Sequence, residues 1–305
     1  MKILIVSIPS VHVIRWIENL SESGHELYWF DVLGKGKLPT QISIQQITEW
    51  KKRKLPYIKG EHFLRQKFPT IYNRLQPFLE VTSNEKLAQI LNDIQPDLVH
   101  SFEMQSCSYP ILKTMKKFSQ IKWLYSCWGS DLFYYQNQPQ HESKIKAVLS
   151  RINYLHTDCN RDFILAKNLG FKGKHIGVIP GGGGFHLEEF LPFVKPIAER
   201  KIILIKGYHH HVGRGLVVVK AIQSIQKTIE ALGFEVVVFG AHPIVIDYVK
   251  DNKLSFQVYD RHGLAHNELL QLMGESAIYL GNSISDGMPN TLLEALIMGA
   301  FPIQS

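Results

Sequence analysis

The chain has 305 residues, of which 45% are hydrophobic and 20% are charged. This composition excludes an intrinsically disordered chain, and the length favours two domains of about 150 residues each. Lys and Arg number 34 against 27 Asp and Glu, so the surface is basic. A basic surface fits anionic partners as a class, without choosing among phosphates, acidic lipids and nucleic acid.

The three cysteines occur in no paired metal spacing, which argues for a reducing compartment and against a disulfide framework. The N-terminal stretch MKILIVSIPS is too short for a signal peptide and is interrupted by Pro9. No run approaches the roughly 20 apolar residues of a membrane span. We therefore expect a cytoplasmic protein, and contact with the inner face of the cell membrane stays open.

Short apolar runs alternate with helical patterns over the first 180 residues. Strand–helix–strand alternation of this kind predicts a parallel sheet with helices on both faces. Strands are predicted over 2–7, 25–32, 97–102, 122–128, 153–158 and 175–180, and helices over 10–23, 84–94, 106–118 and 160–169.

A glycine-rich stretch, PGGGGFHLEEFLPFVKP (180–196), then interrupts the alternation. The pattern restarts after it, so we predict an α/β protein with two Rossmann-like doubly wound domains: 1–180, a linker over 181–199, and 200–305. The later strands are predicted over 201–206, 234–240, 254–260, 277–282 and 301–304, and the later helices over 213–232, 242–252, 265–275 and 290–298.

Segment 49–80 breaks the alternation. It carries eight Lys and Arg against three Glu, interleaved with six aromatic residues. Two interpretations stay open. The segment is either a solvated insertion whose aromatics pack on the N-terminal domain, or a surface that contacts an anionic membrane.

The stretch SDGMPNTLLEALIMG (285–299) places two acids, Asp286 and Glu294, eight positions apart around the start of a predicted helix. The stretch follows a predicted strand, and the carboxyl ends of parallel strands are where ligands bind in open α/β sheets. A helix N-terminus there suits a phosphate. A carboxylate one turn inside the helix suits neutral hydroxyl groups, as on a ribose or a sugar. A solvent-facing Glu294 on an amphipathic helix is the alternative.

This stretch resembles the acid-x7-acid signature of retaining glycosyltransferases of family 4, which have the GT-B fold. The resemblance implies that Glu294 holds the ribose hydroxyls of a nucleotide-sugar. Asp286, with the backbone of Gly287 and Met288, would hold the donor sugar. The helix start, at Asn290, Thr291 and Leu292, would meet the diphosphate.

The same resemblance extends to IKGYHHHVGRGLVVVKAI (205–222). It implies that Lys206 and Arg214, with Gly215 at the helix start, bind the diphosphate, where negative charge grows as the glycosidic bond breaks. His209–His211 are interpreted as a loop that lines the cleft, because three consecutive residues cannot all point at one ion. We therefore predict neither a metal nor a prosthetic group.

In the first domain, SCWGSDLF (126–133) resembles the family's H-G-x-D turn and makes Asp131 a candidate catalytic residue. Trp128 stands where the family often has a sugar-contacting His, so it is expected to stack on a sugar or to fill the cleft wall. The glycines of 181–184 permit close backbone approach and hinge freedom. His12 and His100 are weaker candidates, each with a packing role as the alternative.

The resemblance implies a hexosyltransferase that moves sugar from a UDP- or GDP-sugar to a saccharide or lipid-linked acceptor with retention, in surface polysaccharide or glycoconjugate assembly. Nucleic acid is not among the expected partners. Family members continue beyond FPIQS (301–305), so we expect an incomplete C-terminal domain. The alternatives are another GT-B enzyme, such as a nucleotide-sugar epimerase or a sugar phosphorylase, and a non-catalytic binding subunit.

Overall fold

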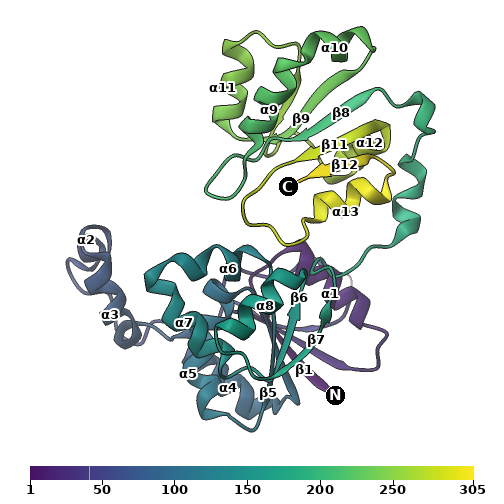
Figure 1. Cartoon of the computed structure of the whole chain (residues 1–305). Coiled ribbons are helices and arrows are strands. Elements are labelled where there is room, and N and C mark those ends of the chain that lie inside the picture. Colours follow the sequence, from purple (N-terminus) through teal and green to yellow (C-terminus); the bar gives the residue numbers. More distant parts are fainter. Residues whose placement is uncertain (41) are drawn as a thin grey trace. The chain divides into compact units, whose positions relative to one another are not determined.

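A computed structural model describes residues 1–40 and 42–305 of the chain. It divides into two compact units, Met1–Gly184 and Phe185–Ser305, and each is built on one parallel sheet flanked by helices (Figure 1). The predicted fold class, α/β with two Rossmann-like domains, is therefore confirmed. The boundary between the units lies within the predicted linker 181–199.

The first unit has a seven-stranded sheet in the order β3-β2-β1-β4-β5-β6-β7. Neighbouring strands are parallel throughout, and the order reverses between β1 and β4. The strands at the centre are buried almost from end to end, as expected where helices cover both faces. The strands are β1 (Lys2–Ser7), β2 (Glu26–Asp31), β3 (Gln45–Ile47), β4 (Leu98–Phe102), β5 (Lys122–Ser126), β6 (Tyr154–Thr157) and β7 (Lys174–Val178).

Local signals set several helix starts in this unit. Thr82 and Glu85 form a reciprocal capping box for α4, and Ser10 caps α1. The predicted helix 106–118 is instead a π turn, a 3₁₀ turn that contains Pro110, and a short α5, because proline disfavours a continuous helix. The helices are α1 (Val11–Leu20), α2 (Glu61–Lys67), α3 (Pro69–Leu79), α4 (Ser83–Ile94), α5 (Leu112–Lys117), α6 (Ser130–Phe133), α7 (Pro139–Leu149) and α8 (Asn160–Asn168).

The second unit has a five-stranded parallel sheet in the order β10-β9-β8-β11-β12, which reverses between β8 and β11. The predicted helix 213–232 is two helices, with a break at Ile225. The elements are β8 (Ile202–Lys206), α9 (Gly215–Ser224), α10 (Gln226–Ala231), β9 (Glu235–Ala241), α11 (Pro243–Asp251), β10 (Gln257–Asp260), α12 (His266–Glu275), β11 (Ser276–Gly281), α13 (Asn290–Ile297) and β12 (Phe301–Gln304).

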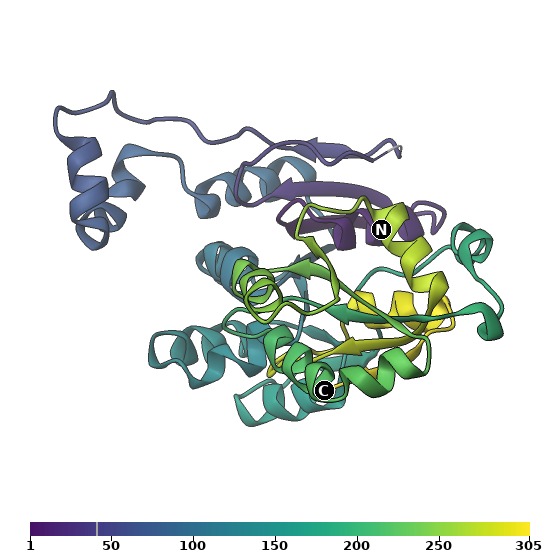
Figure 2. The same cartoon turned by 90° about the horizontal axis from the view of Figure 1, so that it is seen from above.

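Segment 49–80 contains α2 and α3, which stand away from the seven-stranded sheet (Figures 1 and 2). Trp50 packs on the unit, with its ring 5.6 Å from that of Phe30. The four aromatics Tyr57, Phe63, Phe68 and Phe78 are instead exposed. The base of the segment therefore packs on the N-terminal domain, whereas these four aromatics of and around α2 and α3 do not.

The glycine-rich stretch at the end of the first unit packs on α1. Trp16 Nε1 donates to the carbonyl of Gly181 at 3.0 Å, and Asn19 Nδ2 donates to that of Gly183 at 2.6 Å. Gly183 has φ +88°, and a Cβ there would lie 2.7 Å from the backbone nitrogen of Trp16. Gly183 therefore makes a close approach that a larger residue would prevent.

Candidate functional site

Two predicted site residues meet where the strand order of the second unit reverses. Lys206 is the last residue of β8, and the loop that carries Asp286 follows β11, the neighbouring strand. Nζ of Lys206 lies 4.0 Å from Oδ2 of Asp286. Such a reversal opens a crevice at the carboxyl ends of the strands, which is where doubly wound folds bind their ligands.

The Lys206 ammonium is enclosed and lies under the influence of both predicted acids. Burial lowers the pKa of Lys206, while the charges of Asp286 and Glu294 oppose that shift and raise it. The same two carboxylates contribute to the raised pKa of Tyr279, which burial dominates. The two acids of the acid-x7-acid stretch therefore act on common groups, in keeping with their spacing.

Glu294 lies in α13 with only 6% of its side chain exposed. His266, the first residue of α12, brings Nε2 to 3.1 Å from Oε1 of Glu294. A carboxylate this deep needs hydrogen-bond partners, and the imidazole from a neighbouring helix is one of them. The alternative of a solvent-facing Glu294 does not fit this burial.

Asp286 is more open, with 35% of its side chain exposed. Its backbone N–H donates to Oγ of Ser283 at 3.3 Å, which fixes the turn at the start of the loop. Gly287 and Met288 follow directly and are half-buried. The partly exposed aspartate thus lies beside Lys206, past the carboxyl ends of β8 and β11.

The start of α13 follows Pro289, which is the N-cap residue and supplies no side-chain cap. The hydroxyl of Thr291 lies 3.0 Å from that of the buried Tyr279. The N–H of Leu292 donates to the carbonyl of Pro289 at 3.0 Å, so this amide is already engaged. An anion at this helix start would lie at the positive end of the helix dipole, beside Asn290 and Thr291.

Arg214 and Gly215 complete the loop from β8 to α9. The Arg214 guanidinium donates to the carbonyls of His210 at 2.7 Å and Gly213 at 2.9 Å, so it braces this loop rather than reaching Lys206's partner acids. A Cβ on Gly215 would lie 2.7 Å from the backbone carbon of Gly207. The sequence Gly-x5-Gly-x-Gly over 207–215 therefore lets the loop fold tightly back on the strand end.

The histidine run 209–211 lies in that loop, and its side chains serve local contacts. Nδ1 of His210 accepts from the N–H of Val212 at 3.2 Å, and its ring centroid lies 5.5 Å from that of His242. Burial lowers the pKa values of His209 and His210. The rings of His209 and His210 therefore line the loop as neutral groups.

Asp131, in the first unit, is buried among donors. Oδ2 accepts from the N–H of Met104 at 3.0 Å and the hydroxyl of Tyr125 at 2.6 Å. Oδ1 accepts from the N–H of Trp128 at 2.9 Å and the thiol of Cys127 at 3.2 Å. Burial, and then the charge of Glu103, raise the pKa of Asp131 to about 7. Asp131 thus joins the loops that follow β4 and β5.

Trp128 comes together with His12, the other candidate of this unit, at the carboxyl ends of the strands. Their ring centroids lie 5.6 Å apart with an edge-to-face arrangement. Nε1 of Trp128 is buried and has no hydrogen-bond partner among the described residues. Beside them Glu103 follows β4 with φ +66°, a backbone conformation that costs energy for a residue other than glycine. This edge marks the strand-order reversal between β1 and β4.

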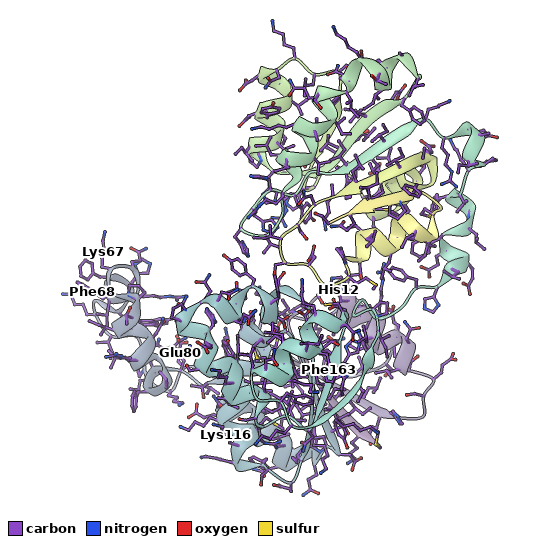
Figure 3. The ribbon with its side chains drawn as sticks, in the orientation of Figure 1. His12, Lys67, Phe68, Glu80, Lys116 and Phe163 are labelled. Carbon is purple, nitrogen blue, oxygen red and sulfur yellow. The ribbon has the colours of Figure 1, made fainter. Side chains whose placement is uncertain are left out.

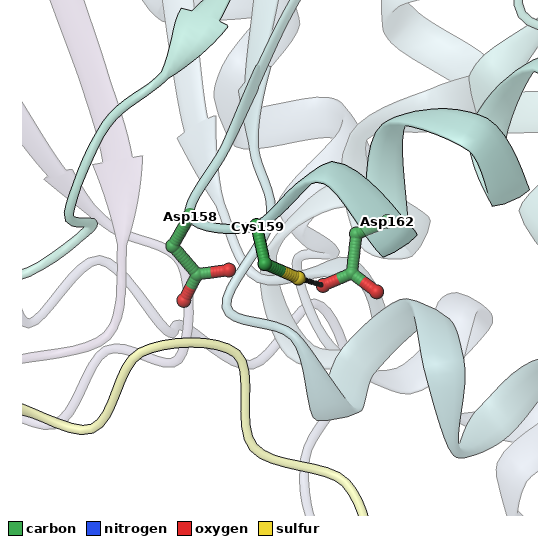
Figure 4. Close-up of side chains that lie close together, drawn as sticks. All are labelled: Asp158, Cys159 and Asp162. Atoms are coloured by element: carbon green, nitrogen blue, oxygen red, sulfur yellow. Dashed lines mark hydrogen bonds between the residues drawn. The ribbon is translucent and has the colours of Figure 1, made fainter.

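Three further polar side chains gather at the end of β6: Asp158, Cys159 and Asp162 (Figure 4). Their possible ligand atoms lie within 4.8 Å of one another. Arg161 Nε lies 2.9 Å from Asp162 Oδ1, and burial raises the pKa of the Cys159 thiol to about 12. Because Asp162 is already engaged by the Arg161 guanidinium and by the Cys159 thiol at 3.1 Å, we assign no metal to this group.

Sequence reasoning missed His266 and Tyr279 as neighbours of the candidate residues Glu294 and Thr291. His266 stands at a helix start and Tyr279 in the middle of a buried strand. Neither position differs in pattern from an ordinary cap or core residue. Only the packing of α12 and β11 against α13 brings them to Glu294 and Thr291.

Comparison with known proteins matches residues 2–159 to a family model described as glycosyl transferase 4-like. A search of the curated proteins gave no match. Among solved structures, a glycosyltransferase from Rickettsia africae is 17% identical with a TM-score of 0.64, and the match covers 100% of this chain and 79% of that chain.

Two other solved structures show the same fold. A UDP-GlcNAc 2-epimerase from Methanocaldococcus jannaschii is 12% identical, with a TM-score of 0.59 and coverage of 100% of this chain and 83% of that one. The Anabaena protein Alr3699/HepE in complex with UDP is 11% identical, with a TM-score of 0.61 and coverage of 100% and 80%. At these identities the likeness concerns the fold. The family match spans more than half of the chain, so the chain belongs to the glycosyl transferase 4-like family and is a glycosyltransferase with the GT-B fold.

Proposed function

We propose that this glycosyltransferase binds a UDP-sugar in its second unit and transfers the hexosyl group, with retention, to a saccharide or lipid-linked acceptor. The observation that carries the proposal is the convergence of Lys206, Asp286 and Glu294 at the β8/β11 reversal, beside the start of α13. The cation and the helix N-terminus suit the diphosphate and its growing negative charge. The two carboxylates suit the hydroxyl groups of the ribose and of the sugar.

Each residue has a distinct proposed role. Lys206 and the N–H groups of Asn290 and Thr291 bind the diphosphate, and Arg214 and Gly215 hold the loop beside it. Glu294, oriented by His266 at 3.1 Å, accepts hydrogen bonds from the ribose hydroxyls.

The remaining groups act on the sugar and the acceptor. Asp286, with the backbone of Gly287 and Met288, accepts hydrogen bonds from the donor sugar. Asp131 shapes the acceptor side through the loops that it joins.

In the proposed step, the bond between the sugar C1 and the diphosphate oxygen breaks while the acceptor hydroxyl oxygen bonds C1 on the same face. The hydroxyl proton passes to an oxygen of the leaving phosphate. The positive charge of Lys206 stabilises the diphosphate as its negative charge grows, and it does so in a partly water-excluded position where charge interactions are strong.

The choice of UDP rests on similar folds: the Anabaena protein is in complex with UDP, and the epimerase is named for UDP-GlcNAc. The basic, aromatic segment 49–80 belongs to the same unit as the predicted acceptor side. The proposal therefore places the acceptor at the inner face of the cell membrane, as in surface polysaccharide or glycoconjugate assembly.

A thermal-shift panel of UDP, GDP, ADP and their sugars tests the donor. We expect UDP and its sugars to raise the melting temperature, and Glu294→Ala to weaken UDP binding by about 1–3 kcal/mol, because charged hydrogen bonds to the ribose are lost. Glu235→Ala, an exposed position at the start of β9, removes the same charge and should leave binding unchanged. Equal UDP binding by all three proteins would refute the assignment of Glu294.

Product analysis separates transfer from epimerisation. A transferase releases UDP in step with glycosylation of the acceptor, and the anomeric proton signals of donor and product report retention. Conversion of a UDP-sugar to its epimer, with no UDP released and no acceptor required, would contradict the proposal and favour the epimerase alternative.

A further inference from the structure

The arm, residues 55–79, carries an apolar exterior. Eight large hydrophobic side chains within these 25 positions are between 43% and 81% exposed, and Phe78 at 70% and Tyr57 at 81% are the most open. They lie on both helices and on the turn that precedes them. The eight are Leu55, Tyr57, Ile58, Phe63, Phe68, Ile71, Leu75 and Phe78.

The interior of the arm is polar instead. Glu61, the one acidic residue of 55–79, is 8% exposed and accepts from Arg53 Nη2 at 2.8 Å and from the Tyr72 hydroxyl at 3.2 Å. Glu80, at the base, lies 3.5 Å from the same guanidinium. The arm thus turns its one acid inward and its apolar groups outward, the reverse of an ordinary helical pair in water.

The charged groups left on the outside are all cations. Lys59, Arg65, Lys67 and Arg74 lie among the exposed aromatics, and none forms an ion pair with another residue in the part of the chain that the structure describes. Figure 3 shows Lys67 and Phe68 side by side on the arm, with Glu80 where the arm joins the unit. Cation and aromatic are therefore presented together.

The base holds the arm in place. The N–H of Val81 donates to the carbonyl of Lys52 at 2.9 Å, and that of Lys54 to the carbonyl of Leu79 at 2.8 Å. Lys54 Nζ also donates to Glu85 Oε1, at the first turn of α4, at 2.6 Å. The exposed side chains are consequently carried on a supported projection.

We propose that the arm is a membrane-contact element that inserts its aromatic side chains into the interface of an anionic lipid bilayer. Apolar side chains gain by leaving water for the boundary of headgroups and acyl chains, and the cations gain from acidic lipids. A second arm would present the same sign of charge, so charge complementarity favours an anionic surface over arm-to-arm pairing. The arm is a surface apart from the donor site, so this proposal and the donor-site proposal can fail separately; the placement of the acceptor at a membrane rests on the arm.

Sedimentation of the full chain with vesicles tests the proposal. We expect pelleting with phosphatidylcholine vesicles that contain about 30% phosphatidylglycerol at about 50 mM NaCl, and much less at about 500 mM. Pure phosphatidylcholine should bind weakly. No pelleting with the anionic vesicles at low salt overturns the proposal.

Two sets of variants identify the surface. Phe63→Ser/Phe68→Ser/Phe78→Ser removes apolar groups, and Lys59→Gln/Arg65→Gln/Lys67→Gln/Arg74→Gln removes charge. Each set should reduce the membrane partition coefficient by about tenfold or more. Both sets replace exposed side chains, so circular dichroism melting should show that the folded state is kept. If the triple variant fails to fold, the single variant Phe78→Glu tests the same surface with a milder change.

Matched controls make the same changes elsewhere. Val217→Ser/Ile225→Ser/Leu232→Ser replaces three exposed apolar side chains of the second unit. Lys113→Gln/Lys116→Gln/Lys117→Gln/Lys172→Gln removes four exposed lysines of the first unit. Both controls should pellet like the parent protein. If they lose binding as much as the arm variants do, the arm is not the contact.

Sedimentation velocity without vesicles tests whether the arm binds a second copy of the chain instead of a membrane. If the arm pairs with a second copy of the chain, the parent protein is a dimer and the Phe→Ser variant a monomer, which would overturn the membrane proposal. Hydrogen exchange supplies the positive counterpart: amides of 61–79 should exchange more slowly when anionic vesicles are added, and unchanged exchange there contradicts insertion.

Discussion

Nε2 of His266 lies 3.1 Å from Oε1 of Glu294, joining the first turn of α12 to the middle of α13. The imidazole is half-exposed whereas the carboxylate is enclosed, so the histidine acts as the outer support of a buried acid. A side chain held in one orientation binds a ligand without first losing rotamer freedom. If Glu294 holds the nucleotide as proposed, His266 affects nucleotide affinity through Glu294.

His266→Ala should weaken UDP binding by about 0.5–1.5 kcal/mol, less than Glu294→Ala, because one supporting hydrogen bond is lost. Isothermal titration calorimetry of the single variants and of the double variant gives their coupling free energy. We expect the two losses to be less than additive. Full additivity would show that His266 acts independently of Glu294.

Lys206→Met should lower turnover more than it weakens donor binding, because the leaving charge develops mainly in the transition state. We expect kcat to fall by about 100-fold or more, with KM changed far less. Lys206→Arg keeps the charge and should restore part of kcat. A parallel loss in kcat and 1/KM would instead indicate a general binding role.

Burial lowers the pKa of Lys206, so the activity should depend on pH through this residue. The ammonium form is the active one, so activity should decline as the pH rises through the lowered pKa, earlier than an exposed lysine would allow. The alkaline limb of the pH profile measures this. Lys206→Arg should move the decline to higher pH, because the guanidinium stays charged.

The sequence predicted much of the fold because buried strands of parallel sheets are short apolar runs, and KILIVS or KIILIK can hardly be anything else. The spacing of Asp286 and Glu294 around a helix start after a strand also predicted that they face a common point, and both carboxylates act on Lys206. The contacts that these acids make could not be predicted, since His266 and Lys206 arrive from other elements, and no local pattern records a contact 28 or 80 positions away.

For the arm, the sequence did not predict the orientation of the side chains. Its composition was plain, but which residues face outward was not, because the pattern has no clean helical period. The Arg53 guanidinium sets the orientation, because it pairs with Glu61 and Glu80 on the inner side. That pairing joins residues 8 and 27 positions apart and can be seen only in the folded structure.

Asp131→Asn should destabilise the protein by about 2–4 kcal/mol. Each carboxylate oxygen accepts two hydrogen bonds, one from a backbone N–H and one from a side chain. Whichever way an asparagine is placed, its NH₂ group would face two donors. Urea denaturation measures the loss, and unchanged stability would show that the four contacts carry no net energy.

Gly215→Ala should impair both stability and donor binding. The added Cβ would lie 2.7 Å from Gly207 and 2.9 Å from the carbonyl of Lys206, so the strand end and the start of α9 would have to separate. We expect a loss of about 1–3 kcal/mol in the free energy of unfolding and weaker UDP binding. Gly233→Ala, where space is open but φ is +72°, controls for a glycine lost far from the site: it should lower stability without changing UDP affinity.

A buried histidine pair in the first unit predicts the response to acid. Nε2 of His100 lies 2.7 Å from the hydroxyl of Ser126, which lies 3.1 Å from Nδ1 of His156. Because Nε2 of His156 lies 2.9 Å from the carbonyl of Ile179, that nitrogen donates and Nδ1 accepts. The Ser126 hydroxyl therefore donates to His156, which is held neutral, and accepts from Nε2 of His100. Burial lowers the pKa of His100 to about 3 and also lowers that of His156.

A histidine with a lowered pKa in the folded state stabilises the protein above its ordinary pKa of 6.5, and this stability is lost as the pH falls toward the folded value. Between pH 7 and pH 5 the unfolded chain takes up about 0.7 proton at His100 and the folded chain almost none. The loss for this residue is about 2 kcal/mol. Urea denaturation of the parent protein and of His100→Gln at both pH values measures it. The glutamine amide can still donate to Ser126 but does not titrate, so this variant should lose about 2 kcal/mol less than the parent, and an identical pH dependence would show that His100 is not responsible.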